Sequence, residues 1–288
     1  MYINDVSESI ESVKNSLNEA SKKVSLIKEL AVSKGLPLAS RLDVALFFIS
    51  RAISTLENLS VIESEPIKPT QGEIMDIEVE QDLLALNRKL ALENRKLLDQ
   101  YGVKAIDFMG SLGAGKTSII EALIDSLKDR YRIAVIVGDV ATSIDAERIS
   151  RHGAKAIQIN TGKECHLDSQ LVRRALQLLD LKNIDLLFIE NVGNLICPAD
   201  FPLGAHKRVV VVSVSEGEDM VVKHPLSFKD VDVVVINKID VAKIFNVDVQ
   251  SLIGDVREIN PRAKIVLTSA KERVGIVDLI KALNLSDN

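Results

Sequence analysis

The chain has 288 residues, of which 47% are hydrophobic and 27% charged, and 36 Lys plus Arg against 41 Asp plus Glu leave a formal charge of −5. This length and apolar content suffice for one large α/β domain, with or without a helical appendage. The acidic balance argues against a nucleic-acid partner, because neutralising a phosphate backbone needs clustered positive charge.

Two further classes of protein are not expected. No apolar run reaches the roughly 18–20 residues that span a bilayer, and the first segment lacks the basic start of a signal peptide. Two cysteines, Cys165 and Cys197, do not make a disulfide scaffold. We therefore expect a cytoplasmic protein without a membrane partner.

Residues 1–62 are expected to form an α-helical hairpin. Apolar residues recur at alternating spacings of four and three from Val6 to Ala31, which is the a/d seam of a coiled-coil-like helix. Gly35 and Pro37 end this helix, and a second helix is expected from about Leu38 to Leu59. A hairpin of this size buries little by itself, so we interpret it as an interaction module that dimerises, docks on the next domain or meets a partner.

A linker and a second domain follow. Residues 63–74 contain two prolines and one glycine without apolar periodicity, which is typical of a linker. From Asp76 to about Gln100 the sequence consists of strong helix formers and predicts one long charged helix. We assign residues 75–288 to a single domain that begins with this helix.

Strand and helix signals alternate after Lys104. Several predicted strands are continuous Val and Ile runs, as expected of parallel strands buried on both faces. The alternation predicts an α/β fold with a mostly parallel central sheet. The expected strands are Ala105–Met109, Ile133–Val137, Ala156–Ile159, Asp185–Ile189, Val209–Val214, Val231–Ile236 and Lys264–Thr268. The expected helices between and after them are Lys116–Asp129, Asp168–Leu179, Asp248–Ile259 and Gly275–Leu283.

The segment after the first of these strands carries a phosphate-binding pattern. Gly110 to Thr117 match G-x4-G-K-[ST], in the strand–loop–helix context that this motif requires. The glycines let backbone N–H groups turn toward a phosphate at a helix N-terminus. Lys116 is expected to place its charge on the β- and γ-phosphates, and Thr117 to ligate Mg²⁺ through its hydroxyl. The pattern predicts a P-loop NTPase.

Two later motifs indicate which base the bound nucleotide carries. Asn237, Lys238 and Asp240 end a buried strand in the N-K-x-D pattern, and Ser269-Ala270-Lys271 form an S-A-K element after the last strand. The Asp240 carboxylate can accept from both N1–H and N2–H of guanine, a donor pair that adenine lacks. Asn237 and Lys238 would brace the loop and cover the base. In this order behind a P-loop, the two motifs predict GTP and not ATP.

Three acidic residues are candidates for Mg²⁺ binding and hydrolysis. Glu190 follows the fourth predicted strand, where a GTPase keeps a γ-phosphate-sensing switch, and Gly193 offers a backbone N–H three residues on. Asp139 lies just past the second strand and is expected to reach Mg²⁺ directly or through water. Asp145 lies in the predicted first switch and is a candidate catalytic residue beside Lys116 and Glu190, although a helix cap would explain a lone aspartate equally well. The residues expected around the phosphates are Gly110, Ser111, Leu112, Gly113, Ala114, Gly115, Lys116, Thr117, Ser118 and Gly193.

Both cysteines lie in segments that leave strand ends on the side of the P-loop. Neither segment has the C-x2-C spacing of a zinc finger, so two buried thiols are an alternative. Cys165 is followed by His166, however, and Cys197 comes shortly after Glu190. Thiolates and an imidazole suit Zn²⁺ or Ni²⁺. Three ligands do not close a tetrahedron, whereas a symmetric dimer that brings two sets face to face would complete one.

Together with their flanking residues, these motifs resemble the HypB family, the nickel-inserting GTPases of nickel–iron hydrogenase maturation. The resemblance covers about Leu83 to Leu279, roughly two thirds of the chain. Its most distinctive runs are GKECHLD at 162–168 and ENVGNLICPADF at 190–201. It is also carried by NRKLL at 94–98, DFMGSLGAGKT at 107–117, GDV at 138–140, DAER at 145–148, HGAK at 152–155, HKRVVVVS at 206–213 and VINKID at 235–240.

The resemblance implies a homodimeric GTPase of the SIMIBI class that binds GTP and Mg²⁺. It also implies delivery of nickel to the hydrogenase large-subunit precursor, together with a HypA-type metallochaperone. Cys165, His166 and Cys197 would bind Ni²⁺ or Zn²⁺ at a nucleotide-dependent dimer interface. The chain departs from the family pattern in lacking a histidine-rich tract or cysteine cluster before His152, so nickel storage is not expected, and the hairpin at 1–62 has no recognised counterpart.

Three alternative functions stay open at this point. The urease accessory GTPase UreG would be expected to show Cys-Pro-His where this chain has Cys165 and His166 directly adjacent. A P-loop small-molecule kinase is disfavoured by the paired N-K-x-D and S-A-K motifs. A passive nickel store is disfavoured by the small number of plausible ligands.

Overall fold

The computed structural model describes residues 2–33, 46, 49, 53, 79–140, 144–162 and 164–286. The chain divides into two compact units, Met1–Ile77 and Glu78–Asn288, and each is considered by itself. The linker predicted at 63–74 and most of the second predicted helix lie outside the described residues. Of that helix, Leu46, Ile49 and Ile53 are described, and all three are helical and half-buried.

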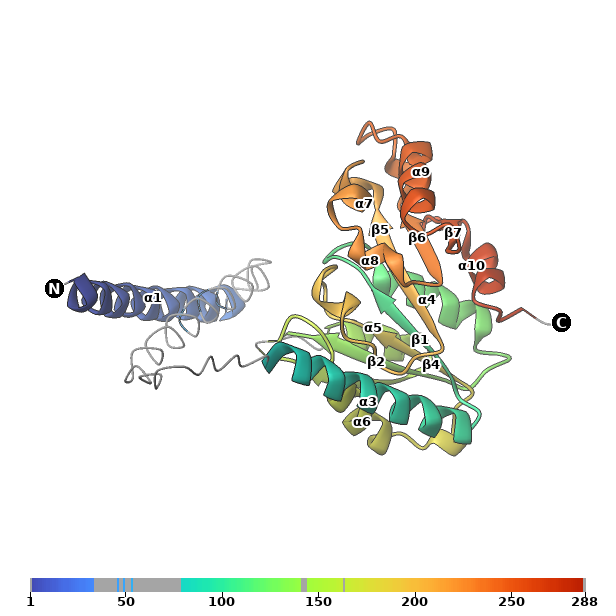
Figure 1. Ribbon diagram of the computed structural model, residues 1–288, viewed down its shortest axis with the longest axis horizontal. Helices are drawn as coiled ribbons and strands as arrows, with labels where there is room; N and C mark the ends of the chain where they lie inside the picture. Colours follow the sequence, from blue (N-terminus) through green and yellow to red (C-terminus); the bar gives the residue numbers. More distant parts are fainter. Residues whose placement is uncertain are drawn as a thin grey trace, which may run out of the picture. The chain divides into compact units, whose positions relative to one another are not determined.

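The N-terminal unit contains α1, a single helix of 32 residues at Tyr2–Ser33 (Figure 1). It is the helix that the a/d seam predicts, and it extends past the seam at both ends. Leu17 and Val24 on the seam are half-buried, whereas Val13 and Ile27 keep about half of their surface exposed, at 51% and 49%.

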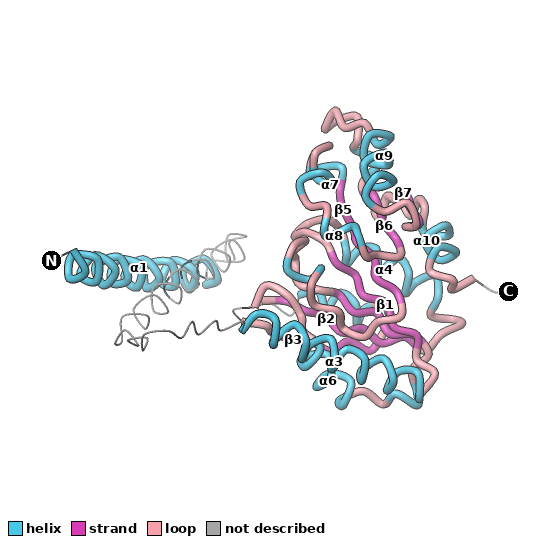
Figure 2. The backbone as a smooth tube through the Cα atoms, viewed as in Figure 1, coloured by secondary structure: helices cyan, strands magenta, loops and turns pink. Residues whose placement is uncertain are grey.

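The second unit is built on a sheet of seven parallel strands in the order β3-β2-β4-β1-β5-β6-β7 (Figures 1 and 2). The mostly parallel α/β sheet predicted from the sequence is therefore confirmed. The strands are β1 Lys104–Met109, β2 Ile133–Asp139, β3 Lys155–Asn160, β4 Leu186–Glu190, β5 Lys207–Ser213, β6 Val233–Asn237 and β7 Lys264–Leu267.

Helices cover both faces of this sheet. The α-helices of the unit are α3 Val79–Gln100, α4 Lys116–Leu127, α5 Ile144–Arg151, α6 Ser169–Leu178, α7 Met220–Lys223, α8 Leu226–Lys229, α9 Val249–Ile259 and α10 Ile276–Ala282. Ile106 and Phe108 of β1 join a core with α4, α5 and α10. Ala105, on the opposite face, packs with α3 and α6, and Met109 on that same face packs with α7, α8 and α9. The alternation of side chains along each strand thus supplies two apolar faces, and helices bury both.

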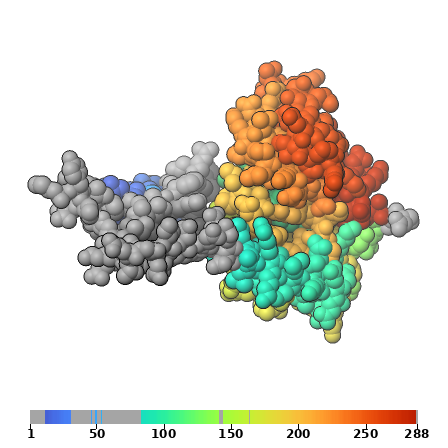
Figure 3. All heavy atoms as spheres, in the orientation of Figure 1, coloured from blue at the N-terminus to red at the C-terminus, as the bar shows by residue number. Residues whose placement is uncertain are grey.

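Helix α3 lies on the surface of the second unit, where its atoms are cyan in Figure 3, and it packs beside α6 (Figure 1). Its inner face is polar at two points. The buried Asn94 amide donates to the Ser169 carbonyl at 2.8 Å and to the Leu203 carbonyl at 3.2 Å. Asn87 accepts from the Ser169 N–H at 2.7 Å and donates to the Pro202 carbonyl at 3.0 Å. The helix therefore fastens the start of α6 and the segment before β5 to each other.

Some element bounds differ from the sequence predictions. The fifth strand ends at Ser213 and not at Val214, because Ser213 and Glu216 form a reciprocal capping box around the 3₁₀ turn Val214–Glu216. The sixth strand begins two residues later than predicted, at Val233. Helix α5 was not predicted at all, since only Ile149 of its eight residues is buried.

The parallel order places the carboxyl ends of all seven strands at one edge of the sheet, where open α/β folds bind their ligands. The P-loop, the Glu190 segment, the N-K-x-D motif and the S-A-K element all leave strands at this edge. Among the residues that the structure describes, no helix combines the length and apolar character that crossing a membrane requires.

Candidate functional site

The phosphate loop runs between β1 and α4 and depends on glycine. Gly110, Gly113 and Gly115 have φ angles of 150°, 80° and 102°, which side chains rarely adopt. A Cβ atom on Gly110 would overlap the Val211 carbonyl, and one on Gly115 would overlap the Asn237 side chain. The loop is therefore packed closely from two sides, as the P-loop pattern requires.

Lys116 closes the loop from inside. Its ammonium group donates to the carbonyls of Gly110 at 2.9 Å and Ser111 at 3.1 Å. Burial lowers the pKa of Lys116, and the nearby Glu190 carboxylate opposes that shift. The side chain thus holds a cation at the centre of the loop, in the place where the sequence predicts phosphates.

Thr117 and Glu190 meet beside the loop. The Thr117 hydroxyl donates to Glu190 Oε1 at 2.7 Å, and burial raises the pKa of Glu190 to about 7 against the opposing charge of Lys116. Among the described residues, Glu190 Oε2 is buried and has no hydrogen-bond partner. A hydroxyl and a carboxylate with one uncommitted oxygen form a donor set that fits Mg²⁺.

The other two acidic candidates lie on the β2 side of the loop. Asp139 is the last residue of β2, and its Oδ1 accepts from the Val140 N–H at 2.6 Å. Asp145 lies in the first turn of α5 and pairs with Arg148 at 3.2 Å. Arg148 also binds Glu121 of α4 at 2.8 Å, so α5 is tied to the helix that follows the P-loop. Residues 141–143 lie outside the described part of the chain.

Asn237 connects the predicted base-binding motifs to the P-loop. Its amide donates to the Ala114 carbonyl at 2.9 Å, and its oxygen accepts from the Thr268 hydroxyl at 3.0 Å and the Ala270 N–H at 3.1 Å. One buried side chain therefore joins the phosphate loop, the end of β6 and the segment after β7. That is the bracing role that the sequence predicts for this asparagine.

The remaining residues of the two motifs surround Asn237. Lys238 has a φ of 63°, and its ammonium group donates to the Gly113 carbonyl at 2.7 Å. Asp240 is exposed in the 3₁₀ turn Ile239–Val241. Ser269 is buried and Lys271 exposed. The Asp240 carboxylate, which is predicted to read guanine, is thus open to solvent. The neighbouring Lys238 is hydrogen-bonded to the P-loop.

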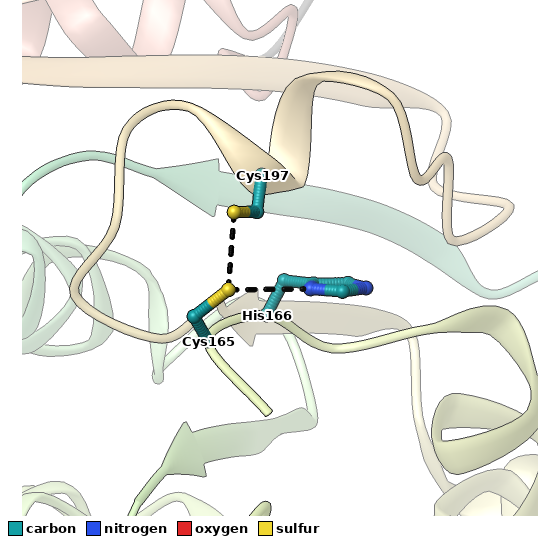
Figure 4. A group of neighbouring side chains, drawn as sticks. All are labelled: Cys165, His166 and Cys197. Atoms are coloured by element: carbon teal, nitrogen blue, oxygen red, sulfur yellow. Dashed lines mark hydrogen bonds between the residues drawn. The ribbon is translucent and has the colours of Figure 1, made fainter. Parts of the chain in front are cut away.

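Cys165, His166 and Cys197 come together although they lie on two loops (Figure 4). The two sulfur atoms are 3.0 Å apart, and Cys165 Sγ is 3.8 Å from His166 Nδ1. One ligand atom from each residue lies within 4.8 Å of the others, and all three side chains are half-buried. Two thiols and an imidazole at this spacing can bind one soft metal ion.

The surroundings of this cluster favour metal binding. Burial lowers the pKa of His166, against the charges of Glu164 and Asp168, and so favours the neutral imidazole that a metal needs. The His166 ring lies against Phe201 with 4.0 Å between the ring centroids. The Asn194 amide donates to Cys197 Sγ at 3.2 Å, which helps to fix the position of this sulfur.

The metal cluster and the phosphate loop share backbone contacts. Gly110, the first residue of the P-loop, forms an isolated antiparallel bridge with Asn194. Asn191, next to Glu190, accepts from the Leu167 N–H at 3.0 Å, and Leu167 follows His166 directly. Both ligand-bearing loops are therefore attached to segments that line the nucleotide site.

Sequence reasoning did not single out Asn191, Asn194 or Arg148, which make these connections. Asn191 and Asn194 flank Gly193 in the segment after β4, so two amides beside a switch glycine were the available signal. Arg148 offered no comparable signal, because Glu121, the partner through which it ties α5 to α4, comes from a different helix.

Comparison with known proteins agrees with this geometry. The family model for the CobW/HypB/UreG nucleotide-binding domain matches residues 104–267. A probable hydrogenase maturation factor HypB of Methanocaldococcus jannaschii is 53% identical over 210 residues, which are 73% of this chain and 95% of that protein.

Two solved structures are also similar. The crystal structure of the hydrogenase maturation factor HypB from Archaeoglobus fulgidus has a TM-score of 0.66 and 45% identity, and the match covers 69% of this chain and 98% of that one. HypB from Helicobacter pylori in complex with nickel has a TM-score of 0.66 and 38% identity, and the match covers 69% and 93% of the two chains. This chain therefore belongs to the CobW/HypB/UreG family of nucleotide-binding proteins, and within that family to the HypB hydrogenase maturation factors.

Proposed function

We propose that this protein is a GTP-hydrolysing nickel metallochaperone that couples GTP-dependent dimerisation to nickel delivery into the precursor of the nickel–iron hydrogenase large subunit. One observation carries the proposal: two thiols and an imidazole converge at the strand edge that holds the P-loop. The hydrogenase maturation role of its relatives and the nickel complex of the Helicobacter pylori protein support it.

In this proposal the P-loop residues bind the phosphates of GTP and Asp240 reads guanine. Thr117 and Glu190 would hold Mg²⁺, with Asp139 reaching it directly or through water. When bound, Mg²⁺ neutralises charge that develops on the phosphates. Lys116 places a second cation beside them, and Asp145 orients the attacking water from the first turn of α5.

Nickel is the cargo, and the ligand set is suited to releasing it. Cys165, His166 and Cys197 supply three ligands per chain, one fewer than a closed tetrahedral site has. Two chains brought together by GTP would complete the coordination, and hydrolysis would open it again. The proposed partners are a second copy of this chain, a HypA-type metallochaperone and the large-subunit precursor, with Zn²⁺ as an alternative occupant of the same ligands.

An anaerobic Ni²⁺ titration of single variants tests the proposal. Cys165→Ala, His166→Ala and Cys197→Ala should each weaken nickel binding by at least the roughly 10–100-fold that follows loss of a group supporting a metal ligand. His224→Ala removes a histidine outside the cluster and should bind nickel like the wild type. Wild-type nickel affinity in all three cluster variants would contradict the proposed ligands.

A further inference from the structure

Asp107 is a charged residue inside an apolar strand. It lies in β1, between Ile106 and Phe108, and its side chain has no exposed surface. Burial raises its pKa to about 6, against the positive charge of Arg208. A buried carboxylate is unfavourable unless its partners compensate for the lost hydration. Neither the nucleotide motifs nor the three metal ligands include it, so its presence needs another explanation.

One set of contacts from Asp107 leads to the first ligand-bearing loop. The Asn191 amide donates to Asp107 Oδ1 at 3.4 Å. The oxygen of the same amide accepts from the Leu167 N–H at 3.0 Å and from the Val192 N–H at 3.1 Å. Because Leu167 follows His166 directly, the orientation of this one amide fixes the backbone beside two of the three ligands.

A second set leads to the other ligand-bearing loop. Arg208 Nε lies 3.6 Å from Asp107 Oδ2. The guanidinium group of Arg208 donates to the Pro198 carbonyl at 2.7 Å and to the Ala199 carbonyl at 3.2 Å. These are the second and third residues of the 3₁₀ turn that begins at Cys197. The 3₁₀ turn that carries Cys197 is thus held by the guanidinium group of Arg208, which is paired with Asp107.

We propose that Asp107 is a positioning residue for the metal ligands, a single buried carboxylate that holds the Cys165–His166 loop through Asn191 and the Cys197 turn through Arg208. The inference rests on the proposed function of these three residues as nickel ligands. β1 continues into the P-loop at Gly110, three residues after Asp107. The Asp107 carboxylate therefore also connects both ligand-bearing loops to the strand that leads into the phosphate loop.

A carboxylate fits this point because one of its oxygens accepts a hydrogen bond, while the other, which is buried without a hydrogen-bond partner among the described residues, faces a positive charge. Asn191 presents an N–H group to one oxygen, and Arg208 presents its positive guanidinium to the other. An asparagine in the same place would offer one acceptor and one donor. It would therefore turn an N–H group toward either Asn191 or Arg208, and one of the two loops would lose its anchor.

The test is the variant Asp107→Asn, which keeps the size of the side chain. Its Ni²⁺ affinity should fall by roughly 10–100-fold, the usual effect of removing a group that supports a metal ligand, while its GDP affinity stays at the wild-type value. Asp185→Asn is a matched control, because Asp185 is also paired with an arginine, Arg132, at 2.6 Å but precedes β4 at the opposite edge of the sheet. It should leave nickel affinity unchanged.

A second readout does not depend on nickel. An arylarsenical binds tightly only where two thiols lie close together, and it should bind the metal-free wild type one-to-one because the sulfurs are 3.0 Å apart. Asp107→Asn should bind it more weakly, and Cys197→Ala should not form the two-sulfur adduct. If the wild type binds the arsenical but not nickel, and Asp107→Asn binds the arsenical more weakly, the proposed function is overturned while the positioning role stays supported.

Loss of GDP binding by Asp107→Asn would reveal that this variant does not fold. Arg208→Met then provides an independent variant. It removes the anchor of the Cys197 turn and should weaken both nickel and arsenical binding. In the Arg208→Met background, Asp107→Asn should lower the nickel affinity by a smaller factor than it does in the wild type, because the two residues act through one pair. Unchanged nickel and arsenical affinities in a GDP-binding Asp107→Asn protein, or fully additive losses in the double variant, would overturn the inference.

Discussion

At the scale of single residues, the nucleotide site depends on side chains that each serve several segments. Asn237 makes three hydrogen bonds, which reach the P-loop, Thr268 and Ala270. Lys116 and Glu190 are both buried beside Thr117, so an ammonium group and a carboxyl group already lie where a magnesium–phosphate group would bind. Asp240 differs from these residues because it is exposed and available to a base.

Asp240→Asn tests the assignment of the base. The substitution replaces a double acceptor by one acceptor and one donor, so one guanine N–H faces another N–H. An unsatisfied polar group costs about 1–3 kcal/mol, or roughly 5–150-fold in GTP affinity. Xanthine nucleotides, which carry an acceptor at that position, should bind the variant better. Competition binding of the two nucleotides measures the change.

The exposed Asp278 provides the control for this experiment, since Asp278→Asn removes the same charge from α10. That variant should retain the wild-type preference for GTP. If Asp240→Asn also retained wild-type GTP affinity, Asp240 would not be the residue that reads guanine.

At the scale of elements, the sheet was predictable because several of its strands are short Val and Ile runs buried on both faces, and such runs leave a strong pattern in the sequence. The P-loop and the base motifs were predictable because each depends on neighbouring residues. Helix α5 was not, since a helix of eight residues with one buried side chain leaves too little periodicity.

The links between the ligand-bearing loops were not predictable for a different reason. Asp107 and Arg208 are about 100 residues apart in sequence, and their pairing follows from β1 lying beside β5. The charge of Asp107 within an apolar strand was the one available signal, and it does not name a partner. Proximity of Cys165 and Cys197 likewise depends on the order of β3, β2 and β4.

The starts of β2 and β4 are joined by an ion pair whose contribution should depend on pH. Arg132 donates from its side chain to Asp185 at 2.6 and 2.8 Å, and these bonds hold the pKa of Asp185 down to about 2 from a usual value of 3.8. Because the folded state lowers this pKa, the stabilisation is fully present above about pH 4 and is lost as the pH falls toward 2.

Asp185→Asn should therefore lower the unfolding midpoint at pH 7 by a small amount, as expected for an exposed pair. The difference from the wild type should narrow between pH 4 and pH 2, which urea unfolding at a series of pH values would measure. Asp129→Asn, an exposed carboxylate just before β2, serves as the control. A difference that stayed constant down to pH 2 would show that the charge of Asp185 is not the source of the effect.

At the scale of the whole molecule, the second unit contains all the residues that the nucleotide-binding family model matches. The three apolar cores of the described chain draw their residues from this unit. The match to the Archaeoglobus fulgidus structure covers 98% of that chain but only 69% of this one, so close to a third of this protein has no counterpart there. These observations support the proposal that the residues before the linker form a separable interaction module.

A variant lacking residues 1–74 tests that proposal. It should bind GTP with the affinity of the full chain, because α3 and all seven strands remain. It should lose only an extra self-association or partner contact, which sedimentation of the two proteins side by side would detect. Insolubility of the shortened protein, or failure to bind nucleotide, would place α1 within the GTPase fold and move the domain boundary.

The last prediction is that GTP binding and nickel binding both shift the same monomer–dimer equilibrium. Asn194 pairs with Gly110 of the P-loop and also donates to Cys197 Sγ, so a rearrangement of the loop around a γ-phosphate should move a metal ligand. If GTP brings two chains together, both ligand sets meet and nickel favours the same dimer. Linkage then requires GTP and nickel to tighten each other's binding by the same factor, typically about 5–150-fold or 1–3 kcal/mol.

Nickel affinity and dimer dissociation should be measured anaerobically with GDP and with a non-hydrolysable GTP analogue. We expect tighter nickel binding and a tighter dimer with the analogue. Cys197→Ala should lose nickel-promoted dimerisation and keep GTP binding, because it removes a ligand without touching the P-loop. Equal nickel affinity in the two nucleotide states would contradict the coupling even if all three residues are ligands, because a ligand that binds two states equally cannot shift their equilibrium. The shared contacts of Asn194 would then join the two sites structurally without transmitting free energy between them.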